Sequence, residues 1–153
     1  MTIPVSTVPA VKALLAQGIT DAATVDPGHQ LLVCFDDPAR YQPDDIVMVG
    51  KVKNRNTVPW QMVGDGGAGW LREDYRIEVE VSVFRGGEDA IAPYNRAWEL
   101  ASIVEYVVRK DPSLGGLVIQ ANPADSQDES SWDETHKGRI VTVTITIAVC
   151  AAL

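Results

Sequence analysis

The sequence holds few of the residues that build compact catalytic or metal-binding motifs. Among 153 residues there are two cysteines, Cys34 and Cys150, and two histidines, His29 and His136. The cysteines lie far apart in the chain, so no C-x-x-C pair exists to bind zinc or form a thioredoxin-like redox site. Neither histidine belongs to an H-E-x-x-H motif, and no G-x-S-x-G turn supplies a serine nucleophile. We therefore expect no catalytic residues, no metal ligands and no cofactor.

Long apolar runs are also missing from the chain. No stretch approaches the roughly 18 uninterrupted apolar residues that a membrane span requires. The N-terminal segment contains Pro4 and Pro9 and has no basic region ahead of an apolar run, unlike a secretory signal. We expect a soluble protein that is made and used inside a cell, with Cys34 and Cys150 as buried free thiols.

Positive charge is the third feature in short supply. Thirteen Lys and Arg residues stand against twenty-one Asp and Glu residues, which gives a formal charge of −8 and a pI near 4.6. Domains that grip nucleic acid through its phosphates are usually basic, so the balance argues against that class. The remaining composition, 46% hydrophobic and 22% charged, is that of an ordinary globular protein, and the length predicts one domain over residues 1–153.

Hydrophobic periodicity predicts two helices and five strands. Thr7 is expected to cap the first helix and Gly18 to end it. In chain order we expect a helix from Val8 to Gly18, strands at His29–Phe35, Ile46–Val52 and Arg72–Phe84, a helix between Glu88 and Lys110, and strands at Leu117–Ala121 and Ile140–Val149.

The order α–β–β–β–α–β–β and the strand patterns predict the fold class. Apolar residues alternate with polar ones from Tyr75 to Val83 and again from Val141 to Val149. This alternation is typical of antiparallel strands with one buried face. We therefore predict an α+β fold, in which two helices pack on one face of a single, mostly antiparallel sheet.

Two segments, 54–71 and 122–138, are longer than ordinary connecting loops and are predicted to be functional or disordered. They contain Trp60, Met62, Trp70 and Trp132. Large apolar side chains on such loops either fold back onto their own domain or contact a partner, since tryptophan is enriched at the centres of interfaces. Both readings stay open, and the four residues are candidate interface residues.

Charged clusters offer further candidates. Lys51, Lys53 and Arg55 alternate along the end of an expected strand, so we expect all three to point to one side. They could meet an acidic neighbouring subunit or passing DNA, or form a solvated strand end. The acids of the second long segment lack calcium-loop spacing and are read as a solvated loop or a partner-docking loop: Asp125, Asp128, Glu129, Asp133 and Glu134.

A glycine-rich run, residues 64–69, matches G-x-G-x-x-G. The dinucleotide fingerprint requires a strand directly before the run and a helix directly after it. Here Pro59 interrupts the approach, and Trp70 leads into the strand that contains Tyr75. We therefore expect a loop and no nucleotide site.

Four short runs resemble the tail terminator proteins of phages with long, non-contractile tails. They are Pro4–Pro9, Gln42–Val47, Val81–Gly87 and His136–Ile140, the last leading into the final Thr/Val-rich strand. The resemblance extends over nearly the whole chain and implies the same order of helices and strands. The family has no catalytic motif, so the resemblance implies assembly and no enzymatic activity.

In that family the protein forms a hexameric ring that caps the tail tube, stops its polymerisation and joins the head. The resemblance thus implies three partners: further copies of the chain, the tail-tube protein and a head-completion protein. It also implies that the protein is located in the virion at the head–tail junction, after assembly in the host cytoplasm. A head–tail connector or stopper is the alternative, and a small-molecule enzyme or binding domain is the more distant one. We expect the Trp-bearing segments to contact the tube and Lys51, Lys53 and Arg55 to meet a neighbour.

Overall fold

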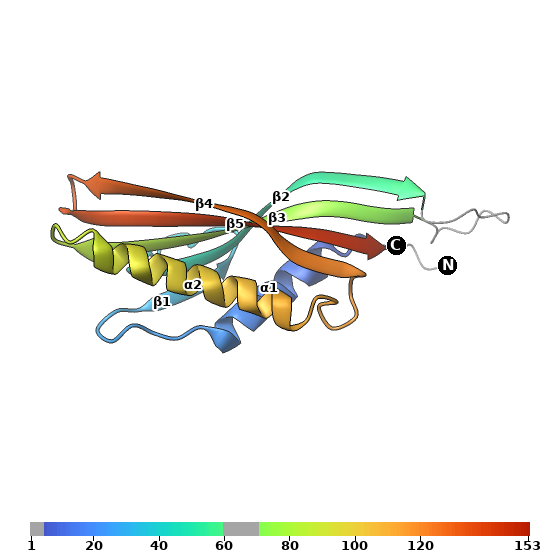
Figure 1. Ribbon diagram of the computed structural model, residues 1–153, viewed down its shortest axis with the longest axis horizontal. Coiled ribbons are helices and arrows are strands. Elements are labelled where there is room, and N and C mark those ends of the chain that lie inside the picture. The colour runs from blue at the N-terminus through green and yellow to red at the C-terminus, as the bar shows by residue number, and fades with distance from the viewer. Residues whose placement is uncertain (1–4, 60–70) are drawn as a thin grey trace.

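The computed structural model describes residues 5–59 and 71–153, which form two helices and five strands in the predicted order (Figure 1). The elements are α1 (Val8–Ala22), β1 (Leu31–Phe35), β2 (Asp45–Pro59), β3 (Leu71–Gly86), α2 (Ile91–Lys110), β4 (Gln120–Asp133) and β5 (Gly138–Ala152). The prediction of an α+β fold is confirmed. Trp60, Met62, Trp70 and the glycine-rich run 64–69 lie outside the described residues.

The five strands form one sheet in the order β1-β2-β3-β5-β4. β1 runs parallel to β2, and the other neighbours are antiparallel, as expected for a mostly antiparallel sheet. The longest pairing joins β3 to β5 from Arg72↔Ala152 to Gly86↔Gly138. The two edge strands, β1 and β4, each have one row of main-chain groups without a neighbouring strand among the described residues.

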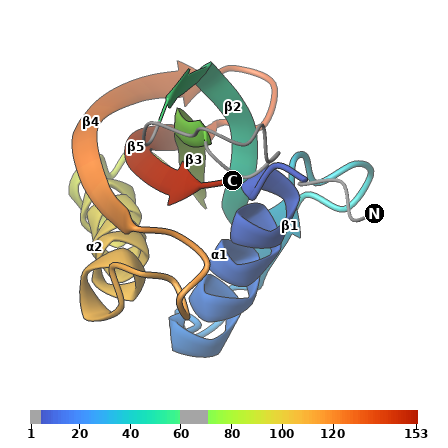
Figure 2. The same cartoon turned by 90° about the vertical axis from the view of Figure 1, so that its right-hand side faces the viewer.

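Both helices pack on one face of the sheet, and they lie side by side below the strands in Figure 2. The predicted alternation is confirmed, since Ile77 and Val79 of β3 and Ile145 of β5 are fully buried under the helices. α1 contributes Leu15 and Ile19 to this core. Burying such side chains supplies the main driving force for folding, at roughly 1.5–3 kcal/mol for each large apolar group. No helix of residues 5–59 and 71–153 covers the opposite face of the sheet.

The first helix is longer than predicted. α1 continues through Gly18 to Ala22, so Gly18 does not end it. A Cβ atom on Gly18 would lie 2.9 Å from Cγ1 of Val107 in α2, closer than van der Waals contact permits. The two helices are therefore in close contact at Gly18, and its missing side chain serves helix packing.

Both predicted loops contain strand residues in the part of the chain that the structure describes. Residues 122–133 belong to β4, which begins at Gln120, and 54–59 complete β2, so the prediction of long loops at these residues is wrong. The strand predicted at Leu117–Ala121 starts later, at Gln120, because residues 117–119 form turns. β4 is rich in Asp and Ser, which have low strand propensity. Its pairing with the Thr- and Val-rich β5 imposes the extended conformation.

The sheet is elongated, and its two ends differ. β2 and β3 reach beyond both helices at one end of the long axis, while the turn between β4 and β5 lies at the other end (Figure 1). We call residues 51–59 and 71–76 the basic arm. No helix in the described part of the chain is long and apolar enough to cross a membrane.

Candidate interaction surfaces

The basic arm carries the three basic residues that the sequence singled out, but on two faces. Nζ of Lys51 lies 3.9 Å from a carboxylate oxygen of Glu78, and Lys53 pairs with the same carboxylate. Nε of Arg55 instead lies 2.8 Å from Oε2 of Glu73. The expectation that all three point to one side is therefore wrong. The pairing register shifts between Lys53 and Asn56, and this β-bulge turns Arg55 toward the other face.

Glu73 joins the basic arm to the start of α1. Its carboxylate is fully buried and accepts hydrogen bonds from Ser6 Oγ at 2.8 Å and from both the amide and the hydroxyl of Thr7 at 2.6 Å. Burial opposes ionisation of Glu73, but these bonds and the one from Arg55 outweigh it and hold the carboxyl pKa below its usual value. Burial also raises the pKa of Tyr75, which is bonded to Thr7, to about 12.

The capping of α1 thus differs from the sequence prediction. Thr7 occupies the N-cap position, but its hydroxyl makes no cap hydrogen bond within the helix and donates to Glu73. A carboxylate at a helix N-terminus is favourable because the exposed amides there carry partial positive charge. No local pattern in the sequence indicates this contact, since the two partners are 66 positions apart.

A second buried acid, Asp45, holds two arginines at the opposite end of the core. Its carboxylate accepts hydrogen bonds from Arg85 Nη1 at 2.6 Å and from Arg96 Nε at 3.0 Å. Arg85 also donates to Asp26 at 2.8 Å, and that bond lowers the pKa of Asp26. Sequence reasoning did not select these residues, although Asp45 and Arg85 lie within two of the four runs that carry the family resemblance.

The edge strand β4 is held to α2 through one acid. Asp128 accepts hydrogen bonds from the Tyr94 hydroxyl at 2.6 Å and from the Trp98 indole nitrogen at 3.1 Å. Trp132 lies on β4, not on a loop, with its ring 5.8 Å from the Arg139 guanidinium and 37% of its surface exposed. Trp132 therefore folds back partly onto its own chain while keeping a face open to solvent.

The other acidic residues of the segment 122–138, which was predicted to be a loop, are of two kinds, with and without an ion-pair partner. Asp125 lies 3.5 Å from Arg76, and Asp133 accepts a 2.9 Å contact from His136. Glu129 and Glu134 are exposed and have no ion-pair or hydrogen-bond partner among the residues that the structure describes. These acids lie on a strand edge and its turn, so they form a fixed charged surface.

The sheet face without helices presents Thr142, Thr144 and Thr146, each half-buried by its strand neighbours. A shallow hollow of about 230 Å³ crosses this face and is lined by Lys53, Arg76 and residues of β4 and β5. This row of β-branched side chains carries no charge.

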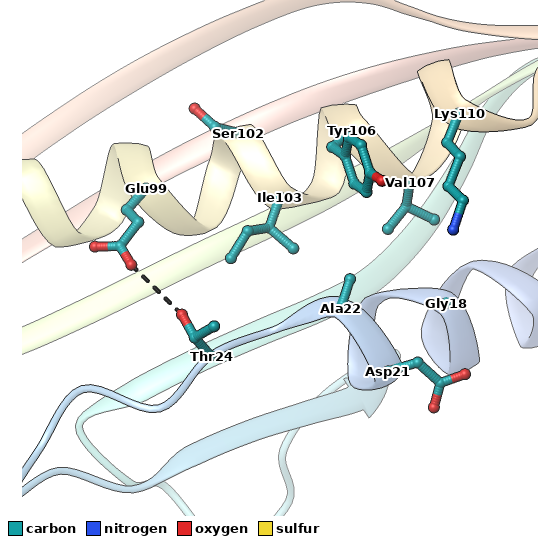
Figure 3. A pocket seen from close by; sticks show the side chains of 10 residues that line it. All are labelled: Gly18, Asp21, Ala22, Thr24, Glu99, Ser102, Ile103, Tyr106, Val107 and Lys110. Atoms are coloured by element: carbon teal, nitrogen blue, oxygen red, sulfur yellow. Dashed lines mark hydrogen bonds between the residues drawn. The ribbon is translucent and has the colours of Figure 1, made fainter.

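A larger groove separates the two helices beyond their contact at Gly18 (Figure 3). It has a volume of about 840 Å³, and Ala22, Ile103 and Tyr106 supply much of its apolar lining. At one end, Thr24 Oγ1 donates a long 3.5 Å hydrogen bond to Glu99. The groove thus has an apolar floor with polar side chains at its rim.

The described residues assemble no group of three His, Cys, Asp or Glu side chains suited to a metal ion. Cys34 and Cys150 are free thiols, as expected, but both are only half-buried. They lie on β1 and β5, which β2 and β3 separate, and burial raises the pKa of each. Compared with known proteins, the chain matches no family model and no curated protein sequence.

Proposed function

We propose that this protein is a phage tail terminator, which forms a hexameric ring on the end of the tail tube and stops further tube growth. The observation that carries the proposal is the basic arm, in which β2 and β3 extend past the helices that cover the rest of the sheet (Figure 1). Along the arm β5 pairs with β3, but β1 pairs with β2 only as far as Val49. Among the described residues the outer edge of β2 from 51 to 59 therefore has no neighbouring strand, and such an edge can pair with another chain. An arm of this kind is suited to binding a neighbouring subunit.

The proposed mechanism is steric. A ring requires a heterologous contact, in which one surface of each copy meets a different surface of the next and the rotation closes. The arm, the open sheet face and the β4 edge are three distinct surfaces on one chain. One side of the ring would bind tail-tube subunits, and the other would receive a head-completion protein at the head–tail junction. This role is structural and uses no catalytic residue.

The proposal is tested by adding the purified protein to tail-tube subunits that are polymerising. We expect tube growth to stop, with the added protein at one end of each tube. Growth that continues unchanged would contradict the proposal. Binding to portal complexes and not to tubes would assign the protein to the head–tail connectors, the alternative class.

A further inference from the structure

The basic arm is a region of net positive charge in an acidic protein. Its residues include five basic side chains and two carboxylates, and one of those carboxylates, Glu73, is fully buried. Lys51 and Lys53 share the single carboxylate of Glu78, so one ammonium charge in this trio is not balanced. Lys51 has 68% of its side chain exposed and Lys53 has 45%. Because Arg55, Arg72 and Arg76 each pair with a carboxylate, the accessible positive charge of the arm lies on Lys51 and Lys53.

The opposite end of the sheet has the reverse charge. We call residues 86–89 and 128–139 the acidic tip, because they contain six carboxylates and two basic side chains. These two segments meet in the sheet, where Gly86 pairs with Gly138. Glu88, Glu129 and Glu134 are exposed and have no hydrogen-bond or ion-pair partner among the described residues.

The two charged regions cannot neutralise each other within one chain. Lys53 is level with Arg76 on β3, whereas Glu129 and Asp133 of β4 are level with Ser82 and Gly86. Six to ten residues therefore separate them along the strands, which at about 3.3 Å per residue is roughly 20–33 Å. Figure 1 shows them at opposite ends of the long axis. At physiological ionic strength the screening length is about 8 Å, so the attraction acts only on a surface in direct contact.

We propose that the basic arm of one copy docks on the acidic tip of the next copy. This inference rests on the proposed function, because it identifies the two surfaces that would join the subunits of the ring. Lys51 and Lys53 supply the positive side, and Glu129 and Glu134 supply the negative side. The surfaces are different parts of the chain, so the contact is heterologous, and it forms a ring when the rotation between neighbouring copies closes. Complementary charge also sets the orientation of docking and speeds encounter.

The experiment reverses charge on each surface separately. The variants are Lys51→Glu with Lys53→Glu on the arm, and Glu129→Lys with Glu134→Lys on the tip. Arg40→Glu with Arg109→Glu is the matched control for the arm, since both arginines are exposed and the net charge changes equally. Subunit association is measured by native mass spectrometry and by electron microscopy of tube ends.

We expect either reversal to weaken association at least tenfold, while the control pair leaves it unchanged. Mixing the arm variant with the tip variant, or combining both reversals in one chain, should restore assembly because opposite charges again face each other. Restoration also shows that the variants fold. The docking proposal would be overturned if neither reversal weakened assembly or if the two reversals did not compensate each other. It would also be overturned if the chain formed only a dimer of two antiparallel copies.

The outcomes separate this inference from the proposed function. A wild-type chain that forms rings on tubes, together with charge-reversed variants that assemble equally well, contradicts the docking surfaces and leaves the terminator function standing. A wild-type chain that stays monomeric both alone and with tail tubes contradicts both proposals.

Discussion

Gly138 shows how a single side chain decides whether β3 and β5 can pair at the acidic tip. A Cβ atom on Gly138 would lie 2.5 Å from the carbonyl oxygen of Arg85 and 2.6 Å from two ring atoms of Phe84. Its partner in the register, Gly86, has no atom within 4 Å of the corresponding position. The two glycines face each other in the sheet and yet differ completely in the space around them.

We therefore expect Gly138→Ala to lower the free energy of unfolding by about 1–3 kcal/mol, because the backbone or the Phe84 ring must move. Gly86→Ala is the control and should change stability little. Urea denaturation of both variants checks the difference. Equal stability of the two variants would contradict the close packing of Phe84 over Gly138.

Glu73 is the residue at which pH should act on stability. The pKa of its carboxyl in the folded chain lies below the ordinary value of 4.5, so ionised Glu73 stabilises the fold above that pH. This stabilisation is lost as the pH falls through the folded pKa. Glu73→Gln should lower the free energy of unfolding at pH 7 by about 2 kcal/mol, since charged hydrogen bonds are lost.

The same variant should also lose less stability than the wild type when the pH is lowered from about 5 to about 3. Glu80→Gln on the same strand is the control, because Glu80 is exposed and has no partner among the described residues. Denaturant titrations at several pH values measure both effects. An unchanged pH dependence in Glu73→Gln would refute the role assigned to this carboxylate.

At the residue scale, sequence reasoning succeeded where a contact follows from periodicity. The buried faces of β3 and β5 were predicted because apolar residues such as Val79 and Ile145 recur every second position. It failed for Glu73 and Asp45, which are buried among polar partners distant in the sequence. Burial of a charge depends on tertiary partners, and periodicity carries no information about them.

Among the elements, the edge strand β4 is joined to α2 through Asp128. The two hydrogen bonds from Tyr94 and Trp98 join the strand to α2, and eight consecutive β4 residues from Asp125 to Trp132 are exposed. Little apolar burial supports this part of the strand, so its local stability depends on pairing with β5 and on these two bonds.

Asp128→Ala should therefore loosen β4 at a cost of about 1 kcal/mol and speed exchange of its amide hydrogens. Gln127→Ala is the matched control, because Gln127 is equally exposed but points to the opposite face of the strand. Hydrogen exchange followed by mass spectrometry compares the two variants. Identical exchange in β4 would contradict the role of Asp128.

The existence and order of the elements were predictable, but the lengths of β2 and β4 were not. Neither extension shows an alternating apolar pattern, since residues 53–59 and 125–132 are mostly polar. Their strand conformation comes from hydrogen bonding to β3 and β5, which is a non-local cause. The bulge after Lys53 then reversed the expected direction of Arg55.

On the scale of the whole molecule, the net charge of −8 conceals a separation of charge along the long axis. Composition alone indicated a protein that does not grip nucleic acid. The fold places the basic arm and the acidic tip toward opposite ends of the sheet, and the docking proposal rests on this separation of charge.

Association should consequently weaken as salt is added. Raising the ionic strength from about 0.1 M to about 1 M shortens the screening length from about 10 Å to about 3 Å and reduces the attraction between exposed charges. Sedimentation velocity at fixed protein concentration should show a growing fraction of free subunits. The variant with Lys51→Glu and Lys53→Glu should respond much less, and association that strengthens with salt would speak against an electrostatic contact.

The central claim is that this chain caps a tail tube as a ring. The most direct measurement is electron microscopy of isolated tail tubes incubated with the purified protein, with averaging of the tube ends viewed along the axis. The account predicts a ring of six subunits at one end of each tube and none along its length. Bare tube ends, or protein scattered along the tubes, would contradict it.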